Sequence, residues 1–209
     1  MDAREPTGQP RRVAETTGTK RDQQREETRA RLLTVSLELF TSKGYAGTTV
    51  RDITGAAGVS SGLFFHYFSS KQDVLEEHVT VARSGVTGFL DALEQSDAPL
   101  ETFRTVATVI LSSFARDDLK RLYLLANQVF SVESIPLSVK NAMRASQPIE
   151  ASVRLIALGQ QRGEIRAGDP LALSLTFWGA IQGVAEVLLW NPHLPIPSAD
   201  HVLGVLAAR

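Results

Sequence analysis

The sequence has no cysteine among its 209 residues. Disulfide bonds and zinc sites built on thiolates are therefore excluded, and a reducing compartment is compatible with the composition. The four histidines are not spaced as metal ligands, so we expect neither a metal nor a cofactor; they are His66, His78, His193 and His201. The N-terminus is polar and lacks the apolar segment of a signal peptide, and we expect a cytoplasmic protein.

The chain also lacks an excess of either charge, since 22 Lys and Arg stand against 23 Asp and Glu. Overall charge therefore does not indicate a nucleic-acid partner, and any basic surface has to be local. Residues 1–20 contain almost no large apolar side chain, so we expect a disordered tail that cannot offset its ordering entropy. Its basic residues, among them Arg11, Arg12 and Lys20, leave two interpretations open: a solvated leader, or an arm that contacts DNA.

The sequence also lacks the alternating pattern of β-strands, and this lack indicates an all-α fold. Apolar residues make up 43% of the chain, which is enough for a core. Residues 21–43 show a clear helix with one apolar stripe at helical spacing, formed by Leu32, Val35, Ser36, Leu39 and Phe40. Further helices are predicted at residues 70–94, 100–115, 118–132, 136–162, 170–190 and from 198 to the C-terminus. Pro148 is expected to divide or kink the helix at 136–162.

Residues 48–71 are predicted to form two short helices joined by a tight turn. Thr49 and Asp52 have the spacing of a capping pattern at the start of the first helix. Gly58 suits a turn that needs a positive φ, and Ser60 is placed to cap a second helix to about residue 66. The inward side of this second helix carries Phe64, with Phe68 just beyond its end.

An α-helix fits the major groove of DNA, and the residues at its N-terminal end reach base edges. We therefore expect DNA contacts from the outward residues of the second helix, namely Ser60, Ser61, Gly62, Leu63, His66 and Tyr67. Among these, Leu63 is the candidate for a thymine methyl group. Phosphate contacts are expected at two helix starts. Thr48, Thr49 and Arg51 lie at the start of the first short helix, and Lys71 lies at the start of the long helix that follows the pair.

The motifs LELFTSKGY and GTTVRDITGAAGVSSGLFFHYFSSKQDVL, within residues 28–79, resemble the tetracycline-repressor (TetR) family of bacterial transcription regulators. The resemblance implies a helix-turn-helix domain at residues 21–70 and an effector-binding and dimerisation domain at 71–209. One position departs from the pattern, because Phe65 stands where the family often has a tyrosine whose hydroxyl meets a phosphate. Two readings follow: His66 replaces that contact, or Phe65 only packs.

The helix at residues 171–190 has a single charged residue and is apolar almost all round. A membrane span is disfavoured because Gln182 and Glu186 would lie in hydrocarbon. A helix that is apolar on every side is otherwise buried on every side. The TetR resemblance implies a homodimer in which the last two helices of each chain form a four-helix bundle; the alternative is a core helix in a monomer.

The same resemblance implies a body cavity for a small hydrophobic effector that releases the protein from a pseudo-palindromic operator. Candidate lining residues, each of a type that more often packs in an ordinary core than contacts a ligand, are Phe89, Phe103, Phe114, Tyr123, Gln128, Phe130, Met143, Trp178 and Gln182. A DNA-binding regulator controlled by a protein partner is the alternative. Gly58 to Gly62 also match the G-x-S-x-G pattern of hydrolases, but that chemistry needs a strand before the serine, so we do not expect an enzyme.

Overall fold

The computed structural model describes residues 20–144 and 148–208, and regular structure in this part of the chain is helical. The helices are α1 (Lys20–Ser42), α2 (Val50–Ala57), α3 (Ser61–Tyr67), α4 (Lys71–Gln95), α5 (Pro99–Ser113), α6 (Asp117–Gln128), α7 (Leu137–Arg144), α8 (Pro148–Gln161), α9 (Pro170–Trp190) and α10 (Ala199–Leu203). The all-α prediction is confirmed. The predicted disordered tail lies outside the described residues except for Lys20, which begins α1.

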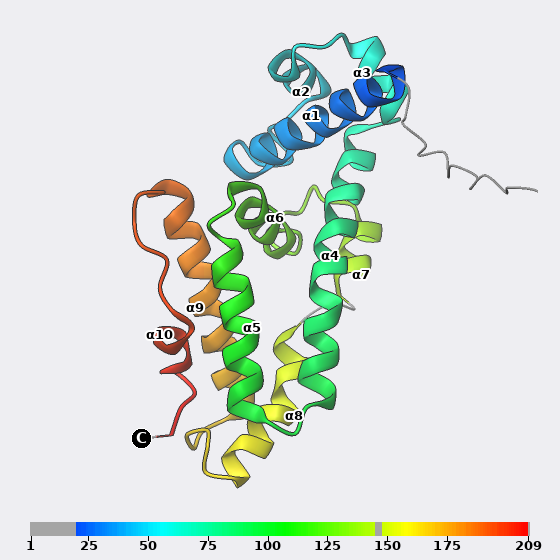
Figure 1. Ribbon diagram of the computed structural model, residues 1–209. Coiled ribbons are helices and arrows are strands. Elements are labelled where there is room, and N and C mark those ends of the chain that lie inside the picture. Colours follow the sequence, from blue (N-terminus) through cyan, green and yellow to red (C-terminus); the bar gives the residue numbers. More distant parts are fainter. Residues whose placement is uncertain (1–19, 145–147, 209) are drawn as a thin grey trace, which may run out of the picture.

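Helices α1 to α3 form a head at one end of the molecule, and α4 leads from the head along the body (Figure 1). The head has its own apolar core, which includes Leu32, Phe40, Ile53, Phe64 and Val74. Residues of α6 and α7 join this same cluster, so the head rests on the body through packed side chains. The body has a second core, built mainly from α5, α8, α9 and α10.

Local signals set the ends of the head helices as the sequence predicts. Gly44 follows α1 at φ 81°, and Gly58 ends α2 at φ 66°, a backbone conformation that costs an L-residue roughly 1–2 kcal/mol. The hydroxyls of Thr49, Ser60 and Ser70 each accept a backbone N–H in the first turn of the helix that follows. These caps satisfy amides that a helix start leaves without partners.

In the body, Pro148 divides the helix predicted at residues 136–162, because α8 begins at this proline. Asp169 caps α9 as its neighbour Pro170 suggests, and α9 ends at Trp190 as predicted.

The prediction of a final helix from residue 198 to the C-terminus is wrong, because α10 has only five residues. The chain then turns so that Leu206 is fully buried, and it pairs with the segment before α9. The amide of Arg166 donates to the carbonyl of Leu206 at 2.8 Å, and Ala208 donates to Glu164 at 3.0 Å. Burial of Leu206 and these long-range hydrogen bonds outweigh the helical preference of the last residues.

Candidate nucleic-acid interface

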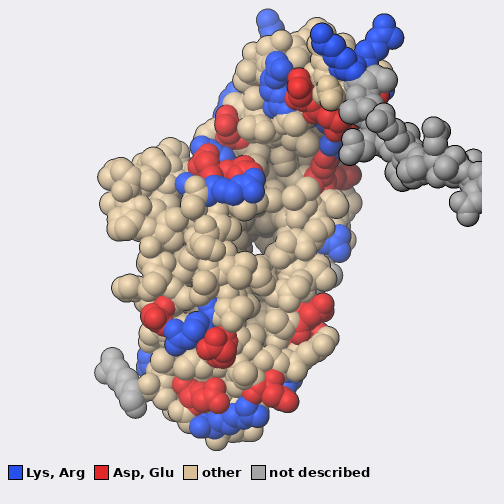
Figure 2. Space-filling model, in the orientation of Figure 1, with Lys and Arg blue, Asp and Glu red and all other residues tan. Residues whose placement is uncertain are grey.

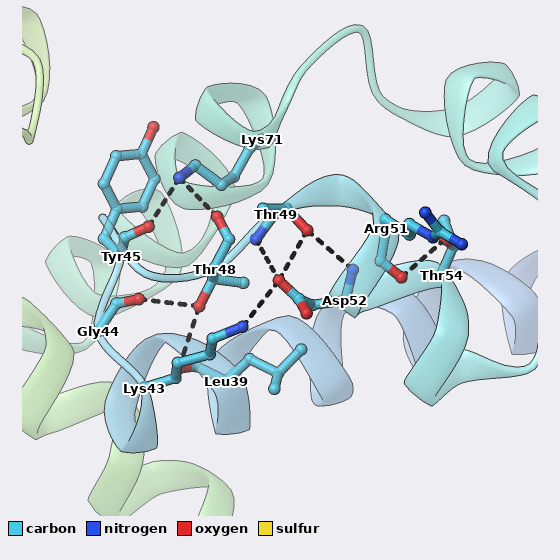
Figure 3. Close-up of polar contacts among 10 residues, drawn as sticks. All are labelled: Leu39, Lys43, Gly44, Tyr45, Thr48, Thr49, Arg51, Asp52, Thr54 and Lys71. Carbon is cyan, nitrogen blue, oxygen red and sulfur yellow. Dashed lines mark hydrogen bonds and ion pairs between the residues drawn. The ribbon is translucent and has the colours of Figure 1, made fainter.

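The start of α2 is fixed by a reciprocal capping box (Figure 3). The Thr49 hydroxyl accepts from the Asp52 amide at 3.1 Å, and the Asp52 carboxylate accepts from the Thr49 amide and hydroxyl, both at 2.7 Å. Lys43 Nζ lies 3.0 Å from the same carboxylate. These hydrogen bonds, that of the Thr49 hydroxyl foremost, lower the pKa of Asp52 to about 2. The exposed first turn of α2 is thereby held in one position.

The turn between α2 and α3 is also held by hydrogen bonds. The Val59 amide donates to the Thr54 carbonyl at 3.0 Å, and the Ser60 hydroxyl accepts from the Leu63 amide at 3.2 Å. Phe64 is fully buried and Phe68 nearly so, which sets the rotation of α3 about its axis. As a result, the outward side of α3 is determined by the packing of these two rings.

The structure brings most of the predicted α3 site residues together on this outward side. Ser60, Ser61, Gly62, Leu63 and His66 are all exposed, while Tyr67 is partly buried with its ring near that of His66. Leu63 and Phe65 are 37% and 55% exposed, and α3 has no Lys, Arg, Asp or Glu. The exposed side of α3 therefore begins with small residues, is apolar at its centre and carries no Lys, Arg, Asp or Glu. Thr49 and Arg51 are exposed at the start of α2.

Two residues predicted to contact phosphates, Thr48 and Lys71, instead make contacts within the head. Thr48 is 1% exposed, and its hydroxyl donates to the Gly44 carbonyl at 2.8 Å. Lys71 Nζ donates to the carbonyls of Tyr45 and Thr48, both at 2.7 Å, and lies 4.1 Å from the centroid of the Tyr45 ring (Figure 3). Burial lowers the pKa of Lys71. Both side chains are therefore engaged inside the head, where they tie the start of α4 to the α1–α2 turn.

A groove of about 390 Å³ beside α3 was not predicted from the sequence. It is lined by residues of α1 and the end of α3: Asp22, Arg25, Glu26, Arg29, His66 and Tyr67. Arg29 pairs with Glu77 of α4 and lies over the Phe68 ring. Lys and Arg side chains project from this end of the molecule (Figure 2). Arg21, Arg25 and Arg29 are spaced four residues apart, which places them on one side of α1. Only the packing of the helices shows that this side adjoins α3.

The candidate effector residues do not form one cluster. Phe103, Phe114 and Trp178 are buried in the body core with Phe89 and Tyr123 packed against it, whereas Met143 and Phe130 belong to the head core. Trp178 donates to the Ser152 hydroxyl at 3.0 Å, and Gln182 donates to Glu186 on the surface of α9. Gln128 is partly buried. Most of these residues therefore have an ordinary packing role in this structure.

Tyr123 of α6 is partly buried against the body core, and burial raises the pKa of its phenol. Figure 2 shows a hollow in the body below α6, between the positions that α4 and α5 occupy in Figure 1.

Helix α9 is long and apolar enough to cross a membrane by length and composition alone. In the structure, one side of it packs into the body core through Phe177, Trp178, Ile181, Ala185 and Leu188. Within residues 20–144 and 148–208, no three His, Asp or Glu residues are grouped to hold a metal ion.

Comparison with known proteins agrees with this geometry. The profile described as "Bacterial regulatory proteins, tetR family" matches residues 32–78, which contain α2, α3 and the capped turn. The chain is 31% identical over 160 residues to the transcriptional regulator AcuR of Cereibacter sphaeroides, covering 73% of this chain and 72% of AcuR. It is 30% identical over 170 residues to the transcriptional repressor DhaR of Mycobacterium sp. strain GP1, covering 75% and 82%.

The fold is also similar to that of the MbdR regulator of Azoarcus sp. CIB, with a TM-score of 0.71 at 20% identity. The match covers 86% of this chain and 97% of MbdR. These regulators bind DNA and are not enzymes, and Ser60 is accordingly a helix cap between two helices. The chain belongs to the TetR family of bacterial DNA-binding transcriptional regulators.

Proposed function

We propose that the protein is a cytoplasmic homodimer that represses transcription from a pseudo-palindromic operator and is released by a small hydrophobic molecule. The observation that carries the DNA part of this proposal is the outward side of α3, exposed from Ser60 to His66 on a turn fixed by caps and by Gly58. Such a helix, presented at one end of the molecule, fits a major groove.

The neutral surface of α3 favours base contacts through Leu63 and the small residues before it, with phosphates held from the flanks. Arg51 and Thr49 provide one flank at the start of α2, and Arg25 with His66 provides the other beside the groove. In this arrangement Thr48 and Lys71 position the head instead of contacting DNA. Phe65, exposed next to His66, has no hydroxyl for a phosphate, so we assign that contact to His66.

The outer side of α9 supports the homodimer. Leu171, Leu175, Val187 and Trp190 are exposed along it, and Trp190 is 71% exposed. Leu194 and Ile196, just past the end of the helix, are also exposed, and the lobe there shows no Lys, Arg, Asp or Glu on the face drawn in Figure 2. A second copy that covered α9 would bury these side chains. Because α10 packs on α5 of its own chain, we place the dimer contact on α9 and not on both of the last helices.

The hollow in the body supports a small-molecule effector. Helix α4, which leads to the head, contributes Phe89, which is partly buried against the body core. A molecule that binds there releases DNA only if it binds more tightly to the arrangement of heads that does not fit the operator.

The test of DNA recognition uses an operator selected from random duplex DNA by the wild-type protein. Leu63→Ala is expected to lose about tenfold in affinity for that operator and to relax the preference at one base step. The control is Leu137→Ala, which removes another exposed leucine, on α7 of the body, and is expected to change nothing. Equal binding by wild type and Leu63→Ala to the operator and to all its single-base variants would exclude Leu63 from readout.

A further inference from the structure

One carboxylate at the start of α6 holds two cations. Asp117 is the first residue of α6, and its two oxygens lie 3.2 Å from Lys120 Nζ and 2.6 Å from Arg121 Nε. Lys120 is almost fully buried and Arg121 mostly so. We refer to these three residues as the Asp117 cluster.

Lys120 connects the cluster to α9. Its Nζ donates to the Leu188 carbonyl at 3.3 Å, within the last turn of α9 and close to Trp190. The last carbonyls of a helix carry the negative end of its dipole and have no partners within the helix. A buried ammonium is costly unless it is paired, so Lys120 depends on both Asp117 and α9.

Arg121 connects the same cluster to the head. Its Nη1 donates to the Thr41 hydroxyl at 2.9 Å, and that hydroxyl donates in turn to the Leu37 carbonyl at 2.8 Å. Thr41 is buried in the last turn of α1. The packing agrees, since α6 contacts both α1 and α9.

We infer that the Asp117 cluster couples the position of α9 to that of the DNA-binding head, and so sets the separation of the two heads in a dimer. The inference rests on the proposed homodimer, in which α9 is the helix between the chains. A shift at the end of α9 moves Lys120, and the shared carboxylate transmits the shift to Arg121 and α1. This route runs through one turn of α6 and does not require α4 to tilt.

Arg121→Met keeps an apolar side chain against α1 but removes the hydrogen bond to Thr41, whose hydroxyl still donates to Leu37. Lys120→Met removes the link to α9. The matched control is Arg116→Met, because Arg116 lies one residue before α6, is exposed, and pairs with Asp118 at 2.6 Å.

Because the chain has no cysteine, Ala46→Cys on the exposed α1–α2 turn gives one nitroxide label per head. Pulsed dipolar spectroscopy of the full-length protein without DNA then measures the distance between heads. We expect one narrow distribution for the labelled wild type and for the Arg116→Met control, and clearly broader distributions for Arg121→Met and Lys120→Met.

A second readout uses the selected operator with one base pair added or removed at its centre. The wild type is expected to lose on the order of tenfold in affinity, and Arg121→Met only a few-fold, because its heads are not held at one separation.

Narrow distributions in all variants, even with a lowered melting temperature, would overturn the inference and leave the homodimer intact. Equal broadening in Arg116→Met would also overturn it, because a local charge effect would then explain the result. The absence of any distance between labels in the wild type would overturn the homodimer itself. Lys120→Met alone could fail to fold, in which case Arg121→Met decides.

Discussion

The head and the body differ in how their structures are specified. In the head, short-range signals act at almost every helix end: the capping box of Thr49 and Asp52, the caps Ser60 and Ser70, and the glycines at positive φ. In the body, the helices are placed by apolar packing between segments distant in sequence, as in the contact of α9 with α6 and α8. A region specified locally keeps a recognisable sequence pattern, whereas one specified by packing accepts many sequences.

The largest effect we expect concerns the body. Leu175→Glu places a charge at an exposed position on the outer side of α9, 58% exposed. If that surface is covered by a second copy, a buried charge should weaken self-association by about a hundredfold or more. Sedimentation equilibrium measures the change, with Val109→Glu on α5 as the matched control on another surface. Identical dimerisation of both variants would remove α9 from the interface.

The next effect lies at the junction of the two regions, where His78 of α4 meets Ser36 of α1. His78 Nε2 is 2.9 Å from the Ser36 hydroxyl, the Phe40 ring packs against the imidazole, and the preceding residue, Glu77, pairs with Arg29 of α1. Burial lowers the pKa of His78 to about 4, from an ordinary value of 6.5. The folded state therefore favours the neutral ring.

The stability that His78 contributes is fully present above pH 6.5 and is lost as the pH falls toward 4. Between pH 7.5 and pH 5, the loss in the free energy of unfolding should be about 2 kcal/mol. Urea denaturation at the two pH values measures it, and His78→Gln should show a smaller dependence on pH. An equal dependence in the variant would mean that the pKa of His78 does not differ between the folded and unfolded states.

The smallest effect tests local specification in the head with two glycines three residues apart. Gly58→Ala should destabilise the protein by about 1 kcal/mol because φ is 66° there. Gly55→Ala, in the helical interior of α2 with open space around a new Cβ, should stabilise it by about 0.5–1 kcal/mol. Thermal or urea unfolding gives both values. If both substitutions changed the free energy of unfolding in the same direction, the positive φ at residue 58 would not be what determines the effect.

The sequence predicted the two regions unequally well. The helix ends, the cap residues and the outward position of Leu63 could be predicted because each depends on neighbours within four residues. The engagement of Lys71 with the carbonyls of Tyr45 and Thr48 could not, since it depends on how the start of α4 meets the α1–α2 turn. For the same reason, the end of the chain was expected to be helical although Leu206 pairs with Arg166.

The body shows the same limit more strongly. An aromatic residue at helical spacing gives no indication of whether it is fully buried in the core, as Phe103 is, or only partly buried against it, as Tyr123 is. That distinction depends on the volume left between helices, which no local pattern encodes. The Asp117 cluster could not be predicted either, because its contacts join residues that are distant in the sequence. Thr41 lies 80 residues from Arg121, and Leu188 lies 68 residues from Lys120.

The central claim is that two α3 helices, held in a pair, read one DNA site. The most direct measurement determines the symmetry of the DNA selected by the wild-type protein, together with the number of chains bound to it in solution. We predict two chains on a pseudo-palindrome whose half-site centres are about one helical turn apart, ~34–36 Å. A single chain on an asymmetric site, or no enriched sequence at all, would contradict the account.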